Sequence, residues 1–219
     1  MQKIKPLPAR KELGLTPQEY SLLRKLSTPI KIQDFLDTLP KNLEKKGETY
    51  YSPRMVLREK KAHCFEGALL AGLALWIQGQ PPLLVDLKTE GDIDHIIALY
   101  QINGYWGAIS KHDGTTLRFR DPVYKTIREL VLSYFHEYFD VKTKKKTLRS
   151  YSRNPLDLRT FDASWITSEK NLFNIVKKLD WSAHIPLLPL KNRKYLRKAD
   201  KMEMLASKIE EWKKSDPRT

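Results

Sequence analysis

The apolar positions in the first part of the chain follow a helical pattern. Thr16-Pro17-Gln18-Glu19 has the spacing of a capping box with proline in the first turn, and Thr28-Pro29 repeats this start signal. Ser52-Pro53 offers a third start signal. Residues 64–77 are apolar on almost every side, which is typical of a helix in the middle of a domain. We therefore predict helices at each of these positions.

Short apolar runs replace this pattern after the Pro81-Pro82 pair. Asn103-Gly104 separates two of these runs, and this dipeptide is the strongest sequence signal for a two-residue β-hairpin. Asp113-Gly114 offers a second tight turn of the same kind. The predicted strands are residues 83–87, 93–102, 105–111 and 115–120.

Helical spacing returns near the end of the strand region. Asp121-Pro122 predicts a helix by the N-cap and first-turn rules, with an apolar face between Val123 and Tyr138. Residues 141–162 are polar and basic, and we expect a loop there. The remaining predicted helices are residues 168–179 and 192–214, the second of which has Trp212 among its apolar positions.

The order of helices, antiparallel strands and further helices predicts one α+β domain with a central antiparallel sheet. We expect an N-terminal arm at residues 1–14, a core at residues 15–141 and a basic helical extension at residues 142–219 that packs on the core. Of the 219 residues, 41% are apolar, so the chain can bury a sizeable core. This composition excludes disorder as its main state.

The net charge of +14 is concentrated towards the end of the chain. Residues 1–141 carry 20 Lys and Arg against 17 Asp and Glu, whereas residues 142–219 carry 20 against 9. A basic region of this kind attracts polyanions in general, although a solvated basic surface is the other interpretation. No known nucleic-acid-binding motif accompanies it. The polyanion-contact candidates are Lys144, Lys145, Lys146, Arg149 and Arg153.

The pattern shows neither a secretory signal nor a membrane-spanning segment. The longest uncharged apolar run, Ala68 to Ile77, is too short to cross a bilayer. The single cysteine, Cys64, excludes an internal disulfide and a four-thiolate metal site. We therefore expect a cytoplasmic protein.

Residues that could form a cysteine active site occur in order along the chain. Cys64 stands at the start of the apolar helix, where free backbone N–H groups and the helix dipole favour the thiolate. His95 follows at the start of the first hairpin strand and is a suitable base for a thiol. With Asn103-Gly104 as the loop, the register places Ser110 diagonally beside His95. A turn at Asp113 would bring a carboxylate to the same end of the sheet.

The segments around these residues share a pattern with a known family. They are residues 62–68 (AHCFEGA), 94–98 (DHIIA) and 106–109 (WGAI). Together they resemble the transglutaminase-like branch of the papain-like superfamily, over about residues 60–125. That family places a nucleophilic cysteine at a helix N-terminus, a histidine on the next strand and an aspartate on the strand after it. Cys64 and His95 match this pattern, but the aspartate position falls on Ser110.

The resemblance implies a papain-like fold and a cysteine hydrolase or acyltransferase without a cofactor. Cys64 would attack a peptide, amide or ester carbonyl, and His95 would carry the proton. Asp113 or Ser110 would orient the imidazole. The acyl-enzyme would then pass its acyl group to water or to an amine. Papain-like enzymes also use an upstream glutamine as an oxyanion donor, and Gln33 is the candidate here.

Other interpretations of the same residues remain open. The family includes inactive members, so a binding module with an unreactive thiol is one alternative. A single unbroken helix over residues 53–77 would place the sulfur in mid-helix and leave it inert. Asp121 has a structural role as a helix cap. A metal site formed by Cys64, His95 and His112 is chemically conceivable, but no local ligand pair supports it, and we expect none.

Overall fold

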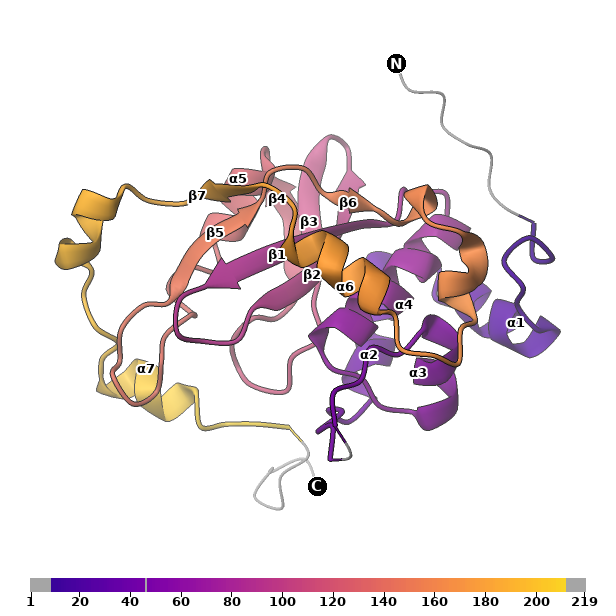
Figure 1. Cartoon of the computed structure of the whole chain (residues 1–219), viewed down its shortest axis with the longest axis horizontal. Helices are drawn as coiled ribbons and strands as arrows, with labels where there is room; N and C mark the ends of the chain where they lie inside the picture. Colours follow the sequence, from indigo (N-terminus) through magenta and orange to yellow (C-terminus); the bar gives the residue numbers. More distant parts are fainter. Residues whose placement is uncertain (1–8, 46, 212–219) are drawn as a thin grey trace.

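The computed structural model describes residues 9–45 and 47–211 (Figure 1). Helix starts predicted from proline and capping residues are confirmed at Pro17, Pro29 and Pro53. The helices are α1 (Pro17–Lys25), α2 (Pro29–Asp37), α3 (Pro53–Glu59), α4 (Cys64–Ile77), α5 (Ile127–Leu132), α6 (Phe173–Asp180) and α7 (Lys201–Ala206), with 3-10 turns η1 (Leu158–Thr160), η2 (Ala163–Ile166) and η3 (Leu190–Tyr195). The strands are β1 (Leu83–Thr89), β2 (His95–Ile102), β3 (Tyr105–Ile109), β4 (Arg120–Tyr124), β5 (Leu148–Ser152), β6 (Leu156–Asp157) and β7 (His184–Pro186).

A central antiparallel sheet organises the described residues, so the α+β class is confirmed. Its strand order is β4-β3-β2-β1-β5-β7, and β6 pairs with β1 beside this path. The hairpin predicted at Asn103-Gly104 is present with the expected register, from Ile102 opposite Tyr105 to Ala98 opposite Ile109. Both turn residues have positive φ, which is why this dipeptide suits the turn.

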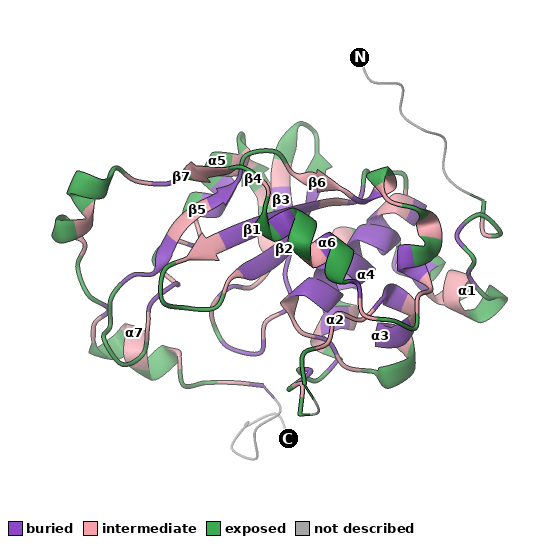
Figure 2. Ribbon diagram, viewed as in Figure 1, coloured by how far each residue is buried: buried purple, intermediate pink, exposed green. Residues whose placement is uncertain are grey.

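Helix α4 forms the centre of the larger of two cores. All of its residues are buried except Cys64 and Trp76, and Figure 2 shows this burial along the helix. It packs against β2 on one face of the sheet, together with α1 to α3 and α6. A smaller core lies around α5 and includes Val85, Ile97 and Leu130. No helix in the described residues combines the length and apolar character needed to cross a membrane.

The second predicted hairpin is wrong. No strand begins directly after Asp113-Gly114. Residues 110–119 form a longer loop, and β4 starts only at Arg120. Asp121 therefore lies in a strand and caps no helix, because Thr126 supplies the cap of α5. The helix start predicted at Asp121-Pro122 is therefore wrong. The proline fits a strand here because β4 is an edge strand, which tolerates proline where no backbone donor is needed.

The C-terminal third differs most from the prediction. The loop expected over residues 141–162 contains β5 and β6, and β7 joins the same sheet, so residues 142–219 are not a purely helical extension. Helix α6 begins later than predicted, and the long helix at 192–214 is replaced by η3 and the short α7. Trp212 and residues 1–8 lie outside the described residues. Of the predicted arm, Leu13 is buried in the main core.

Gly107 in β3 gives a sharp test of this packing. A methyl group there would lie 2.7 Å from the carbonyl oxygen of Arg120 and still closer to the ring of Tyr100. We expect Gly107→Ala to lower the free energy of unfolding by about 1–3 kcal/mol, because a side chain and a strand must shift. Urea unfolding of the purified protein measures this change.

Gly72→Ala in α4 is the matched control. Its added methyl group would lie 3.2 Å from the end of the Leu158 side chain and at ordinary contact distances from Pro82 and Leu84. Alanine also favours a helix over glycine by about 1 kcal/mol. This variant should keep or raise stability. Equal losses from both substitutions would contradict the packing described for β3.

Candidate active site

Cys64 is the first residue of α4, as the sequence predicts. The alternative of one long helix is wrong, because α3 ends at Glu59 and Lys60 adopts a left-handed conformation. The first helical amide with a backbone acceptor is that of Gly67, which donates to the carbonyl of His63 at 2.9 Å. The amides before it belong to the first turn, where helices have no internal acceptors. The half-buried sulfur therefore lies at the positive end of a 14-residue helix.

Two imidazoles contact the sulfur and change its proton affinity. Burial raises the pKa of the Cys64 thiol, but hydrogen bonds and charge from His63 and His95 lower it. The net result is a pKa well below the ordinary value of a cysteine. The two imidazoles therefore favour the thiolate, the form of cysteine that acts as a nucleophile.

His95 is held in one tautomer by Ser110. Its Nε2 lies 2.7 Å from Ser110 Oγ, and the Ser110 hydroxyl donates to the carbonyl oxygen of Leu117. Since that carbonyl can only accept, the Ser110 hydroxyl uses its proton there, and Ser110 Oγ must accept a hydrogen bond from the Nε2–H group of the imidazole. Nδ1 is therefore the nitrogen of His95 that can take the thiol proton. This pairing makes Ser110 the residue that orients the imidazole.

Gln33 positions Ser110 and is not placed as an oxyanion donor. Its Nε2 donates to the carbonyl oxygen of Ser110 at 2.9 Å, and its Oε1 accepts from the Ser110 amide at 3.0 Å. The same Nε2 also donates to Asp37. Both ends of the buried amide are thus engaged, so the oxyanion role suggested by the resemblance does not fit this glutamine. The contact links α2 to the residue behind His95.

His63, directly before Cys64 in the chain, is a further residue of the site. Its Nε2 donates to the carbonyl oxygen of Thr49 at 2.8 Å, and it also lies 3.4 Å from Glu66 Oε1. Burial lowers the pKa of His63, but the contacts with Cys64 and Glu66 raise it, to a net value of about 9. The ring is therefore protonated at neutral pH. The sequence signal for its position was the spacing of His63 and Glu66, which resembles a capping box.

Glu66 connects residues 42–51 to the start of α4 by hydrogen bonds. It is fully buried and accepts hydrogen bonds from the side chains of Asn42 and Thr49 and from the amides of Tyr51 and His63. A buried carboxylate with this many donors is well satisfied. It fixes the backbone of residues 49–51 and the start of α4 around the sulfur.

Asp113 lies at the same end of the sheet but faces a different partner. Its Oδ1 pairs with Lys41 Nζ at 3.3 Å, and no hydrogen bond joins it to His95 in the described residues. His112 stands between them, with its ring 5.9 Å from that of His95. Burial and the charge of His95 lower the pKa of His112 to about 4, so this imidazole is neutral. Of the two predicted orienting residues, only Ser110 contacts His95.

A pocket of about 550 Å³ opens beside the sulfur and is lined by both histidines that contact it. Lys41, Asn42 and Glu44 form part of its wall, so the polar stretch after α2 flanks the site. Tyr138 also lines the pocket; its hydroxyl is buried and has no hydrogen-bond partner in the described residues. Burial and the charge of Cys64 raise the pKa of this phenol, which therefore stays a proton donor.

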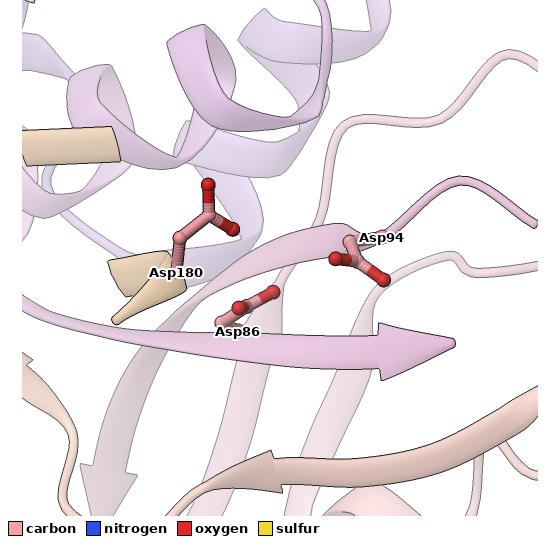
Figure 3. A group of neighbouring side chains, drawn as sticks. All are labelled: Asp86, Asp94 and Asp180. Carbon is pink, nitrogen blue, oxygen red and sulfur yellow. The ribbon is translucent and has the colours of Figure 1, made fainter. Parts of the chain in front are cut away.

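Three carboxylates, Asp86, Asp94 and Asp180, gather at one side of the same pocket (Figure 3). A lysine already lies among them. Lys88 Nζ is 2.7 Å from Asp94, 2.6 Å from Asp180 and 3.7 Å from Asp86. The ammonium group stands where a metal ion would bind, so we assign no metal site to this cluster. The three residues proposed as a conceivable ligand set, Cys64, His95 and His112, do not form a metal-binding group among the described residues.

The candidate polyanion contacts do not form one surface. Lys146 is buried, where it donates to the carbonyl of His136 and pairs with Glu203. Arg149 pairs with Glu90 at 2.8 Å. The exposed members are Lys144 and Lys145 before β5 and Arg153 after it, so the length of the strand separates them.

Comparison with known proteins does not assign the chain to a family. No family model matches it, and a search of curated proteins finds no match. The chemistry of the pocket is therefore inferred from its own residues.

Proposed function

We propose that this protein is a cysteine hydrolase or acyltransferase with a papain-like, transglutaminase-like arrangement of its active site. One observation carries the proposal: a lowered-pKa thiol at the start of α4 contacts His95, whose other nitrogen is held by Ser110. The nucleophile, the base and the residue that orients the base thus occur in one chain of contacts. The alternatives of an inactive binding module and of a polyanion-binding protein have no comparable contact in their favour.

Acylation follows from these positions. The proton of the Cys64 thiol moves to Nδ1 of His95, and the thiolate attacks the carbonyl carbon of an amide or ester. The bond to the leaving group breaks, and the imidazolium gives its proton to the departing nitrogen or oxygen. His63, protonated throughout, stabilises the thiolate by charge. The product of this step is a thioester on Cys64.

Deacylation reverses the proton path. Water, or an amine in a transferase, loses a proton to His95 as it attacks the thioester carbonyl. The sulfur leaves as a thiolate and the acyl group is released as an acid or an amide. The oxyanion formed in each step needs donors nearby. The free amides at the start of α4 and the unpartnered hydroxyl of Tyr138 supply them.

A generic acyl donor tests this proposal before the natural substrate is known. With p-nitrophenyl acetate we expect a burst of about one nitrophenolate per protein molecule and a mass increase of one acetyl group. Cys64 is the single cysteine, so intact-mass spectrometry followed by peptide mapping locates the adduct. Cys64→Ala must lose both signals. A wild-type protein that gains no acetyl group, or gains it only when unfolded, overturns the proposal.

Ser110 and Asp113 provide a second test, because the two residues were alternatives for orienting His95. Ser110→Ala should slow acetylation of Cys64 by about tenfold to a hundredfold, since the imidazole loses the contact that fixes it. Ser110→Thr retains a hydroxyl and should recover most of that rate. Asp113→Ala should leave the rate nearly unchanged, because its partner is Lys41. The reverse ranking would show that the carboxylate is the orienting group.

A further inference from the structure

The pocket has the opposite charge from the protein that contains it. The chain carries a net charge of +14, but the residues that line the pocket include nine carboxylates and only two lysines. The excess of carboxylates remains when Glu210 is left out of the count. Eight carboxylates then face five cations: Lys41, Lys111 and the protonated His63 in the lining, and Lys88 and Arg120, which pair with lining residues.

The negative charge lies next to the proposed catalytic imidazole. Asp94 directly precedes His95, and Asp86 pairs with Ile96 across the β1–β2 ladder. Asp92 belongs to the turn between the same strands and is exposed. Within the described part of the chain, its carboxylate accepts hydrogen bonds from the amide of Ile93 and from the hydroxyl of Thr147, and pairs with no cation. We call Asp86, Asp92 and Asp94 the carboxylate wall. These three residues line the same pocket as Cys64 and His95.

A second, independent feature shows that this wall is incomplete without a donor. The side chain of Asp86 is 1% exposed, and its Oδ2 accepts from His184 at 3.1 Å. Its Oδ1 has no hydrogen-bond partner among the described residues. Buried polar atoms in native proteins are normally paired, and an unpaired one calls for an explanation such as an absent ligand. Asp86 lines the pocket, and a positively charged donor bound there would supply the missing partner.

The rim of the pocket suits the rest of such a ligand. Ile93 and Val141 both line the pocket and are exposed, at 82% and 59%. Apolar side chains around a charged site favour a molecule with a hydrocarbon stem and a charged end, as in lysine or arginine side chains. The apolar rim therefore suits the hydrocarbon stem of such a side chain, and the carboxylate wall suits its charged end.

We propose that the pocket binds an acyl substrate whose side chain ends in an ammonium or guanidinium group, held by the carboxylate wall while Cys64 attacks. The inference rests on the proposed function, because it assigns the substrate class of the same site. In this proposal the positive charge belongs to the acyl substrate itself. The basic C-terminal region plays no part in it.

Two methanethiosulfonate reagents of opposite charge test the field at the sulfur without a substrate. In each, the thiolate attacks the reagent's sulfur, a disulfide forms and a sulfinate leaves. We expect the trimethylammonium-ethyl reagent to modify Cys64 at least about tenfold faster than the sulfonatoethyl reagent, after each rate is divided by that of free glutathione. The ratio should fall as salt is added. Asp92 and Glu48 both line the pocket, so the double variant Asp92→Asn with Glu48→Gln should lower the ratio of the two rates. Glu169 lies outside the pocket, so Glu169→Gln should leave the ratio unchanged.

A matched pair of acyl substrates completes the test. The p-nitrophenyl esters of N-acetyl-lysine and N-acetyl-norleucine differ mainly by the terminal charge, and the lysine ester should acylate Cys64 at least about tenfold faster. If both reagents and both esters react without charge preference, the cationic substrate is excluded and the cysteine enzyme stands. If Cys64 in the folded protein reacts with none of them, the proposed function itself fails.

Discussion

Replacing His95 with alanine is expected to slow acylation of Cys64 by an N-acyl p-nitroanilide about a thousandfold or more, at every pH between about 6 and 9, because the departing aniline nitrogen needs a proton. The reason is that Nδ1 of His95 is the nitrogen left free by the Ser110 contact, so the thiol proton and the leaving-group proton both pass through it. Raising the pH cannot replace this function, because a thiolate alone has no proton to give to the leaving group. The absorbance of the released p-nitroaniline measures the rate.

His136→Ala is the control for this experiment. It removes an imidazole that lies outside the pocket and packs against Phe135, so the acylation rate should stay near that of the wild type. Circular dichroism of both variants checks that the fold is retained. A His95→Ala protein that acylates at the wild-type rate would show that His95 does not carry the proton.

Replacing His63 with alanine is expected to produce a different result, which depends on pH. In the wild type, the protonated His63 helps to hold the pKa of Cys64 well below its ordinary value. Without this charge the thiol pKa rises towards about 8.5, so the thiolate fraction near pH 6 falls and alkylation by iodoacetamide slows by about tenfold to a hundredfold. Near pH 9 both proteins are ionised at the sulfur, and their alkylation rates converge.

This pH dependence separates the two histidines. His63→Ala loses thiolate at low pH but keeps the residue that moves the proton, whereas His95→Ala loses proton transfer at all pH values. His63→Gln is a useful companion, because its amide can still donate to Thr49 without a charge. A loss of alkylation that persists unchanged up to pH 9 in both variants would mean that His63 acts on the fold and not on the thiol pKa.

The sequence predicts those parts of the fold that are determined locally. The start of α2 follows from Thr28 and Pro29, and the β2–β3 hairpin follows from Asn103-Gly104, because caps and two-residue turns depend on adjacent residues. The central helix is predicted because its apolar side chains leave no polar face. Cys64 and His95 come together as expected because these same elements position them.

The parts that were missed depend on contacts between distant segments. Strands β5 to β7 have two to five residues in a basic stretch, and only pairing to β1 and to each other makes them strands. Ser110 is joined to Gln33 by a contact across 77 residues, so no local pattern shows that this glutamine positions the site. The surroundings of His63 also depend on the fold, because its contacts with Cys64 and Glu66 raise its pKa and the distant loop that carries Thr49 accepts its hydrogen bond.

The charge of the pocket belongs to the same class of long-range effects. Its carboxylates come from the segment after α2, from the turn between β1 and β2, and from the end of α6. Each of these segments is unremarkable in a chain with a large positive charge. Only folding concentrates them around one sulfur, which is why composition suggested a polyanion while the pocket favours a cation.

The central claim is that the two imidazoles hold the pKa of Cys64 well below its ordinary value in the folded protein, and titration of the thiol tests this most directly. The thiolate absorbs in the ultraviolet, and with one cysteine in the chain its absorbance can be followed against pH and corrected with the Cys64→Ala protein. The structure predicts a single transition well below the ordinary value of about 8.5. A transition at or above 8.5 would mean that burial outweighs both imidazoles, and it would contradict the proposed active site.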